Sequence, residues 1–424
     1  MVNISKYNSY LKSISQYFGA SLIPMLLNLA SNPFIALNMS PDDYAVTGYY
    51  TSFSALFSPL IVFYMLHYYT KRYFEVSESE RDLLRAMLVK SLIYFSGFIT
   101  FLCFGGLYIY TIFCNSHSSI PFFPYAFLTI FAIPFTGLYT LMLTDFRMGR
   151  QSGKYLKYSL LAGVVLVFLN LLFVVFLKWG AFGKLLAPFI ANIIFFGISC
   201  FNYRHLFNVQ IKKLQVKQMI VFCFPLTIAA MLGFFSNGYD RVFLERLGDN
   251  VELGYYSVGV QMATYIGVFQ TAVGSTFQPD LFQAIVNRDR ARLLKVILLL
   301  IGSTALIVAV FICAAPFIVK VLTAGRYMMS VKYTQIIALS TLSSALYYTI
   351  SQITIALGKS NVTLITKILT TILSIIMFSL LIAHYGFIGA AWGLVFSFII
   401  SFVINIIILL LSNISKNEFK NSPN

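Results

Sequence analysis

Long apolar runs separated by short polar breaks are the main pattern of this chain. Each run is close to the roughly 20 residues that an α-helix needs to cross a bilayer core of about 30 Å. A segment inside lipid must satisfy its own backbone hydrogen bonds, so a helix is the expected structure of each run. We therefore predict an all-α polytopic membrane protein with about 12 transmembrane helices. The predicted spans are 12–38, 45–69, 86–113, 121–144, 158–178, 181–201, 219–240, 253–278, 293–316, 331–357, 361–384 and 388–412.

Three short phrases recur in the second half of the chain, in the same order and at nearly one offset. An even number of spans separates each phrase from its copy, so both halves are expected to start on the same side of the membrane. The pattern predicts two parallel six-helix repeats, an N-terminal lobe at 1–212 and a C-terminal lobe at 213–424. An internal repeat in a membrane protein favours a transporter with its pathway between the halves. The phrases are Gly-Tyr-Tyr at 48–50 and 254–256, Trp-Gly-Ala-Phe-Gly at 179–183 with Tyr-Gly-Phe-Ile-Gly at 385–389, and Gly-Arg at 149–150 with Gly-Lys at 358–359.

Composition and charge support a membrane protein and argue against a nucleic-acid partner. Hydrophobic residues make up 59% of the chain and charged residues only 10%, too few to solvate a soluble protein of this length. The net charge of +16 follows the positive-inside rule when the N-terminus lies in the cytoplasm. We predict that both termini are cytoplasmic and that inner basic residues also contact anionic lipid headgroups. The basic residues that then fall outside are Lys178, Lys184, Arg241, Arg246, Lys320, Arg326 and Lys332.

The residues that carry enzymatic chemistry are nearly missing from the sequence. It contains no Gly-x-x-x-x-Gly-Lys-Ser/Thr phosphate loop and no serine nucleophile motif. The 5 cysteines and 4 histidines match no metal-ligand spacing, and the cysteines are interpreted as small apolar residues of helices. We predict a protein that is not an enzyme and binds neither cofactor nor metal.

Polar residues on two predicted helix faces are the first candidates for a binding site. Ser21, Asn28 and Asn32 are separated by steps of seven and four, which places them on one face of the first span. Gln352 shares a face with Thr341, Ser344 and Tyr348 in the tenth span. Such faces either line a water-filled cavity that binds sugar hydroxyls or hydrogen-bond to neighbouring helices.

Ionisable residues close to the membrane are the second group of candidates, because burying a charge in lipid is costly. Cations near both mouths of a pathway suit an anionic diphosphate or an acidic sugar, and acidic residues beside them suit pairing or ion coupling. The alternative is that these side chains snorkel to the headgroups. The candidate cations are Lys90, Arg147, Lys184, Arg241 and Lys367, and the candidate acids are Asp145, Asp240 and Asp280.

One stretch of the second half resembles a known family of transporters. It runs from Phe224-Pro225 through Asp240-Arg241 and Gly254-Tyr255-Tyr256-Ser257 to Pro279. A proline early in a helix, Asp-Arg at its outer end and Gly-Tyr-Tyr-Ser opening the next helix are similar to the Wzx-type O-antigen flippases. These belong to the polysaccharide-transporter branch of the superfamily that also contains the MATE multidrug exporters.

The resemblance implies a V-shaped, MATE-like bundle of two six-helix lobes around a cationic cavity. It implies alternating-access transport of an undecaprenyl-diphosphate-linked oligosaccharide from the cytoplasmic to the periplasmic leaflet of a bacterial inner membrane, as part of lipopolysaccharide biosynthesis. It also implies partners, an O-antigen polymerase and a chain-length regulator. Family cavities are basic, whereas this chain carries no Arg or Lys at mid-depth in its first two predicted spans.

Two other functions remain open. A MATE-like multidrug antiporter needs a carboxylate within a helix, but the first span has no Asp or Glu and the seventh has only Asp240 at its end. An O-antigen polymerase or ligase has a similar hydropathy profile, but these enzymes carry a large periplasmic loop, and no break in this sequence is long enough to form one.

Overall fold

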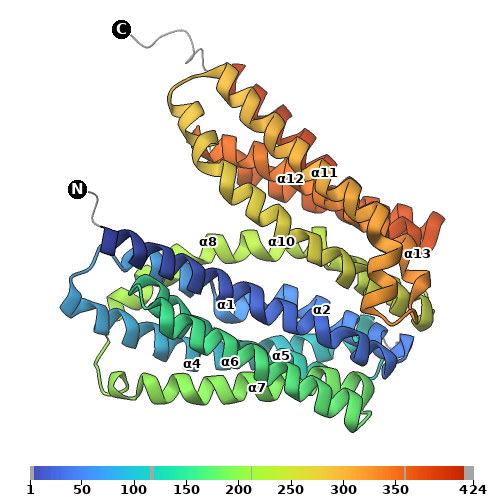
Figure 1. Ribbon diagram of the computed structural model, residues 1–424, viewed down its shortest axis with the longest axis horizontal. Coiled ribbons are helices and arrows are strands. Elements are labelled where there is room, and N and C mark those ends of the chain that lie inside the picture. Colours follow the sequence, from blue (N-terminus) through green and yellow to red (C-terminus); the bar gives the residue numbers. More distant parts are fainter. Residues whose placement is uncertain (1–3, 115–118, 212, 358–359, 415–424) are drawn as a thin grey trace. The chain divides into compact units, whose positions relative to one another are not determined.

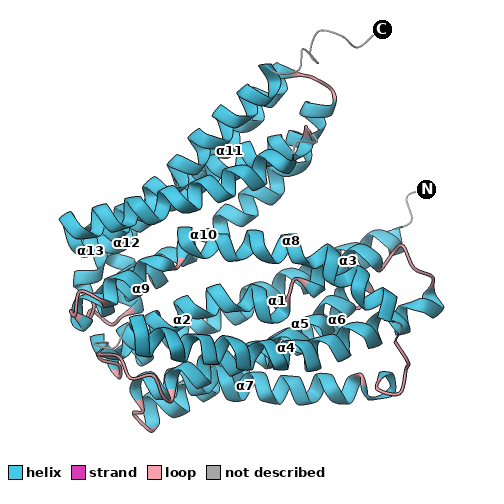
Figure 2. Cartoon of the chain, turned by 180° about the vertical axis from the view of Figure 1, so that it is seen from behind, coloured by secondary structure: helices cyan, strands magenta, loops and turns pink. Residues whose placement is uncertain are grey.

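The structure is a computed structural model that describes residues 4–114, 119–211, 213–357 and 360–414. Within these ranges every regular element is a helix (Figure 2), so the all-α prediction is confirmed. Gly358 and Lys359 lie outside the described residues. That they are the structural counterpart of the phrase at 149–150 stays a prediction.

The first of two compact units contains residues 1–231 together with residues 322–326. In this unit α5 packs against α2, α4 and α7, while α1 packs against α6 (Figure 1). The elements of this unit are α1 (Ile4–Leu37), α2 (Pro41–Val62), α3 (Met65–Arg72), α4 (Glu78–Cys114), α5 (Tyr125–Met148), α6 (Ser152–Asn170) with the π-helix η1 (Leu171–Phe176), α7 (Gly180–Asn202), η2 (Arg204–Leu206) and the first part of α8 (Lys213–Asn237).

The second unit contains residues 232–321 and 327–424. Here α12 packs against both α10 and α13. The elements are the end of α8, α9 (Tyr239–Glu245), α10 (Asn250–Val286), α11 (Arg290–Leu322), η3 (Met328–Ser330), α12 (Val331–Ala356) and α13 (Ser360–Ile414). This division by contacts does not test the duplication that places a lobe boundary between residues 212 and 213, which stays a prediction.

The described helices include nine that are long and apolar enough to span a membrane, or ten if the bent pair α2–α3 is one span. Two features account for the difference from the twelve predicted spans. The glutamine-containing α10 is not among the nine, and α13 is two helices joined at Gly386, whose φ of 57° and ψ of −134° interrupt the helical backbone. Glycine accepts this conformation because it has no Cβ. The protein is a multi-pass membrane protein.

Many large apolar side chains point away from the protein. Leu298 on α11 is 70% exposed and Phe101 on α4 is 66% exposed. In water such a surface would be unfavourable, but in a bilayer the lipid tails solvate it. Close helix packing inside the first unit comes instead from small residues. A Cβ on Gly163 of α6 would lie 2.7 Å from the Cβ of Pro24 on α1, so only glycine allows this approach.

One carboxylate caps two helices of the first unit. Asp43 closes a capping box at the start of α2, where its Oδ2 accepts from the Ser40 backbone N–H at 2.8 Å. Its Oδ1 accepts from the backbone N–H of Ala181 at 2.7 Å, at the start of α7. A Cβ on Gly180 would lie 2.4 Å from the same Oδ1, and Gly180 has a φ of +48°. Both helix starts therefore depend on Asp43.

The bend between α2 and α3 is built from two consecutive left-handed residues. Phe63 and Tyr64 both have a φ of 51°, and the two helices meet at an angle of 47°. Non-glycine residues adopt this conformation at a cost of about 1 kcal/mol or more each, and they persist in it only where the surrounding packing holds them. Phe63 is buried in the core of the unit, where its ring packs edge-on against Phe95 at 5.1 Å between centroids.

Candidate functional site

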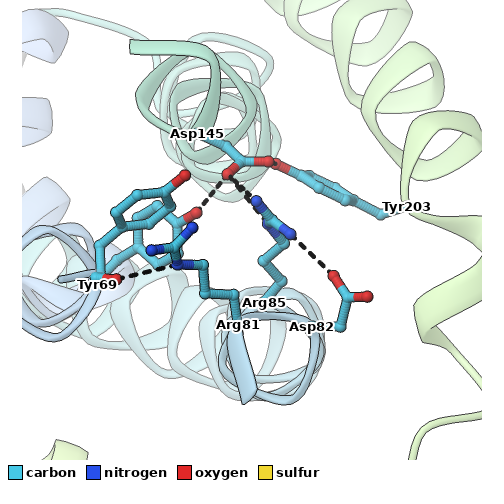
Figure 3. A network of polar contacts seen from close by, with 7 residues as sticks. Tyr69, Arg81, Asp82, Arg85, Asp145 and Tyr203 are labelled. Carbon is cyan, nitrogen blue, oxygen red and sulfur yellow. Dashed lines mark hydrogen bonds and ion pairs between the residues drawn. The ribbon is translucent and has the colours of Figure 1, made fainter. Parts of the chain in front are cut away.

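Asp145, near the end of α5, is the centre of a polar network in the first unit (Figure 3). Arg85 on α4 reaches its Oδ1 from two nitrogens, Nε at 3.0 Å and Nη2 at 2.9 Å. The hydroxyl of Tyr69 on α3 also donates to Oδ1, and that of Tyr203, after α7, donates to Oδ2 at 3.4 Å. Arg85 makes a further ion pair with Asp82 at 2.8 Å. The network joins three helices and the end of a fourth, so Asp145 has a structural role.

Lys90 and Arg147 have different surroundings in the same unit. The ammonium of half-buried Lys90 donates to the backbone carbonyl of Val209 at 2.8 Å, which links α4 to the segment before α8. Arg147 lies in the last turn of α5 and is exposed, where a cation interacts favourably with the helix dipole. Transport roles for both residues stay predictions.

Asp240 and Arg241 lie on the short helix α9 of the second unit. Asp240 is only 1% exposed, and its Oδ2 accepts a hydrogen bond from the hydroxyl of Tyr256 on α10 at 2.5 Å. Its Oδ1 is buried and has no donor among the described residues. Arg241 is half-buried and close enough to Tyr256 to interact with it electrostatically. The sequence placed Asp240 at the end of the seventh span, whereas in the structure α8 ends at Asn237 and Asp240 lies in the first turn of α9, with its carboxylate buried.

Asp280 and Lys184 have fewer hydrogen-bond partners among the described residues than Asp145 has. Asp280 pairs with Arg292 at 2.8 Å, and both side chains are more than 40% exposed, so the pair contributes little to stability. Lys184 lies in the second turn of α7, is half-buried and pairs with no carboxylate of the described residues. A transport role for Lys184 stays a prediction.

The two asparagines predicted on the first span make structural contacts. The amide of Asn28 donates to the carbonyl of Pro24 on its own helix at 3.0 Å. Asn32 is buried, and its amide donates to the carbonyl of Leu322 at 2.9 Å. Asn32 thus connects α1 to the end of α11, which belongs to the same compact unit. The Asn32 bond agrees with the alternative in which the polar face joins helices, whereas the Asn28 bond stays within α1.

Gln352 lines a cavity of about 320 Å³ in the second unit. The cavity lies between α10, α11 and α12, and two pairs of polar side chains bridge α10 and α12 beside it. Gln278 donates to Gln352 at 3.2 Å, and Gln270 donates to Ser344 at 2.8 Å. Amides and hydroxyls in a concave site are the groups that recognise sugar hydroxyls.

Lys367 lies near this cavity, separated from the lining residue Tyr348 by the ring of Tyr347. The ammonium of Lys367 on α13 is 5.5 Å from the ring centroid of Tyr347, a cation–π contact. That ring in turn lies 5.4 Å from the ring of Tyr348, which lines the cavity. The sequence placed Lys367 and Gln352 on different helices and gave no sign that they lie close together.

A second cavity, which the sequence analysis missed, lies in the first unit. It has a volume of about 560 Å³ and lies between α2, the bend to α3, α5 and α7. A signal for it existed in the sequence. Thr129, Thr136 and Thr140 of α5 are separated by steps of seven and four, so they share one helix face, as Ser21, Asn28 and Asn32 do on the first span. All three threonines line the cavity.

An ion pair joins the start of α10 to the start of α12. Lys332 Nζ lies 2.7 Å from Glu252 Oε1, to which the Tyr333 hydroxyl also donates. Burial of the carboxyl would raise its pKa, but the hydrogen bonds from Lys332 and Tyr333 outweigh burial and hold the pKa of Glu252 below its ordinary value of 4.5. A depressed pKa means that the ionised form stabilises the fold.

Replacing Glu252 by Gln should therefore lower the thermal midpoint at pH 7 by about 2 °C, since the pair is partly exposed. The wild-type advantage should be complete above pH 4.5 and disappear as the pH falls through the lower pKa of the folded protein. Thermal unfolding of both proteins in detergent between pH 3 and pH 8 measures this difference in thermal midpoint. Glu75→Gln is the control, because its pair with Arg72 is exposed on both sides. A difference that persists after Glu252 is protonated would exclude the ion pair as its source.

Comparisons with known proteins agree with this architecture. A family model described as "Polysaccharide biosynthesis protein" matches residues 89–332. A comparison with curated proteins finds no match.

Solved structures of transporters share the fold. The lipid II flippase MurJ in an inward closed conformation has a TM-score of 0.72 at 15% identity, over 97% of this chain and 94% of that one. An inward-facing multidrug resistance MATE family transporter of the MOP superfamily has a TM-score of 0.61 at 15% identity, over 95% of this chain and 100% of that one. The Vibrio cholerae MATE transporter VcmN in its bent form has a TM-score of 0.52 at 15% identity, over 96% and 99% of the two chains. The fold is thus that of transporters, which are typically not enzymes, and the low identities show the fold alone.

Proposed function

This chain belongs to the polysaccharide biosynthesis protein family, and we propose that it is a flippase for undecaprenyl-diphosphate-linked oligosaccharide repeat units. The single observation that carries the proposal is the family match over residues 89–332 on a fold shared with a lipid II flippase. The proposed reaction moves an O-antigen or related repeat unit from the cytoplasmic to the periplasmic leaflet of a bacterial inner membrane. Alternating access would move it, with the lipid tail remaining in the bilayer.

The cations and amides of the second unit support this choice of substrate. Lys367 and Arg241 supply positive charge that suits a diphosphate, and the glutamines around the cavity of the second unit suit sugar hydroxyls. The termini are proposed to be cytoplasmic, as the positive-inside rule predicts. An O-antigen polymerase and a chain-length regulator are the proposed partners.

A multidrug antiporter is the second candidate, and one observation favours it. Asp240 is a fully buried carboxylate with one oxygen free of donors among the described residues, and buried acids couple ions to transport. Against this, Asp240 already accepts the hydroxyl of Tyr256, and the family match points to polysaccharide.

Deletion of the gene in its own strain tests the proposal. Surface polysaccharide should be lost, and single lipid-linked units should accumulate on the cytoplasmic leaflet. Units that reach the outer face and cap the lipid core without lengthening would indicate a polymerase instead. Unchanged polysaccharide with altered drug sensitivity would indicate the antiporter.

Replacing Lys367 by Ala should reduce the initial rate of transport about tenfold, which is the value of one charge-assisted hydrogen bond to phosphate. The rate is measured with fluorescent lipid-linked repeat units in vesicles, normalised to the amount of inserted protein. Lys295→Ala is the control, since Lys295 is an exposed lysine of the same unit. A near-normal rate for the Lys367 variant would remove this residue from the site. Lys90→Ala extends the test to the first unit.

A further inference from the structure

Hydroxyl groups from α2, the bend to α3 and α5 line part of the otherwise apolar cavity of the first unit. Its volume of about 560 Å³ lies within the range of small-molecule sites, about 300–1,000 Å³. Polar lining residues come from all of its walls, and those with hydrogen-bonding capacity left for a ligand are Ser54, Ser58, Thr129, Thr136, Thr140 and Asn192.

The threonines of α5 that line the cavity use their hydroxyl protons within their own helix. Thr129 donates its hydroxyl proton to the carbonyl of Tyr125 at 2.8 Å, Thr136 to that of Ala132 at 3.0 Å, and Thr140 to that of Thr136 at 2.8 Å. Each bond lies within α5, so none of these hydroxyls joins two helices. The oxygen lone pairs remain available to a ligand that donates O–H groups.

Three other lining side chains have no protein partner within the described part of the chain. Ser54 and Ser58 on α2 and Asn192 on α7 make no hydrogen bond to a described residue, although all three line the cavity. Ser and Asn both donate and accept. Polar groups between membrane helices that serve only to hold helices together would bond across the interface. These side chains, together with the threonines of α5, instead present unused donors and acceptors to one space.

Charge is missing from this lining, which limits the kind of ligand. No Asp, Glu, Lys or Arg is among the described residues that line the cavity, so nothing there pairs with a diphosphate. At the bend between α2 and α3 the ring of Tyr64 stacks on His67 at 4.6 Å between centroids. An aromatic face beside hydroxyls suits the apolar C–H face of a sugar ring.

We propose that this cavity binds a neutral saccharide unit of the substrate, separately from the site of the lipid diphosphate. The proposal rests on the function proposed above and assigns the sugar end of the lipid-linked substrate to the first unit. The threonines of α5 would accept from sugar hydroxyls, and Ser54, Ser58 and Asn192 would both donate and accept.

Two ligands and two variants test the proposal with the full chain in lipid nanodiscs. One probe is the repeat-unit oligosaccharide of the host strain, cleaved from its lipid diphosphate, and the other is undecaprenyl diphosphate without sugar. Each neutral hydrogen bond is worth about fivefold in affinity, so the double variant Thr136→Val and Thr140→Val should raise the Kd of the oligosaccharide about tenfold or more. The Kd of undecaprenyl diphosphate should not change.

The matched control is Thr111→Val on α4. Thr111 is half-buried and donates to the carbonyl of Leu107 at 2.9 Å, as Thr136 does within α5, but it does not line the cavity. It should leave both Kd values unchanged. If the double variant fails to bind undecaprenyl diphosphate and is therefore misfolded, Ser58→Ala replaces it, with an expected rise in the oligosaccharide Kd of about threefold.

The binding and transport measurements distinguish a failure of the saccharide site from a failure of the proposed flippase function. An oligosaccharide Kd that the variants leave unchanged, or no binding by the wild type, overturns the saccharide site and indicates a cavity that holds water. If such a protein still transports the lipid-linked unit in vesicles, the flippase proposal stands. A shifted Kd in a protein that moves no lipid-linked unit would retain the saccharide site and contradict the flippase.

Discussion

Replacing Arg85 by Met should lower the free energy of unfolding by about 3 kcal/mol, because removing one partner of a buried ion pair leaves the other charge uncompensated. The side chain of Asp145 is 13% exposed and that of Arg85 is 23% exposed, so water replaces little of the lost interaction. Tyr69 and Tyr203 would still donate to Asp145, which keeps the loss below that of a fully isolated carboxylate. Unfolding of the purified protein in detergent micelles measures the effect.

Asp82→Asn is the matched control, because it removes the other carboxylate that contacts the same guanidinium. The Asp82 side chain is 58% exposed, so its loss should change stability by less than about 1 kcal/mol. Combining Arg85→Met with Asp145→Asn should recover part of the loss, since the buried charge is then gone. Equal effects of the Arg85 and Asp82 substitutions would contradict the view that burial gives the Asp145 pair its strength.

Replacing Tyr256 by Phe should lower the free energy of unfolding by about 2 kcal/mol, the value of a hydrogen bond to a buried charged group. The hydroxyl of Tyr256 is the donor to Asp240 Oδ2, while Asp240 Oδ1 has no donor within the described ranges. The substitution removes one oxygen atom and leaves the ring packed against Tyr333 at 5.4 Å between centroids. The loss therefore reports the hydrogen bond and not the packing.

The neighbouring residue supplies the control for this experiment. Tyr255→Phe makes the same chemical change one position earlier, where the ring packs edge-on against Tyr327 at 5.9 Å between centroids, and should have almost no effect. Adding Asp240→Asn to the Tyr256 variant should restore stability, because a neutral amide is less costly to bury than a carboxylate. A Tyr256 variant as stable as the Tyr255 variant would show that the buried carboxylate does not depend on this hydroxyl.

The helices were predictable from sequence because the bilayer leaves the backbone few alternatives. Contacts between residues far apart in the chain could not be predicted in this way. Asp145 could be identified from the sequence as an acid near a helix end. The residues around it do not predict its ion pair with Arg85, which lies 60 positions away in the chain. Local chemistry also leaves two uses open for the same residue type. The amides of Asn28 and Asn32 and the hydroxyls of the equally spaced threonines of α5 all donate to backbone carbonyls, but the threonines also line a cavity. Only the neighbouring helices decide between these uses.

The carboxylate shared by two helix starts has a mechanical consequence. The carboxylate of Asp43 accepts hydrogen bonds at the first turn of α2 and at the first turn of α7, and so links the two helix starts. Both helices are walls of the cavity of the first unit. Neither wall can slide lengthwise past the other without breaking a cap. The end of α2 away from Asp43 has no such cap, and there the consecutive left-handed residues Phe63 and Tyr64 bend the chain. Asp43 thus fixes the spacing of two cavity walls at one end, so a change in cavity width through these two helices would have to arise from the bend.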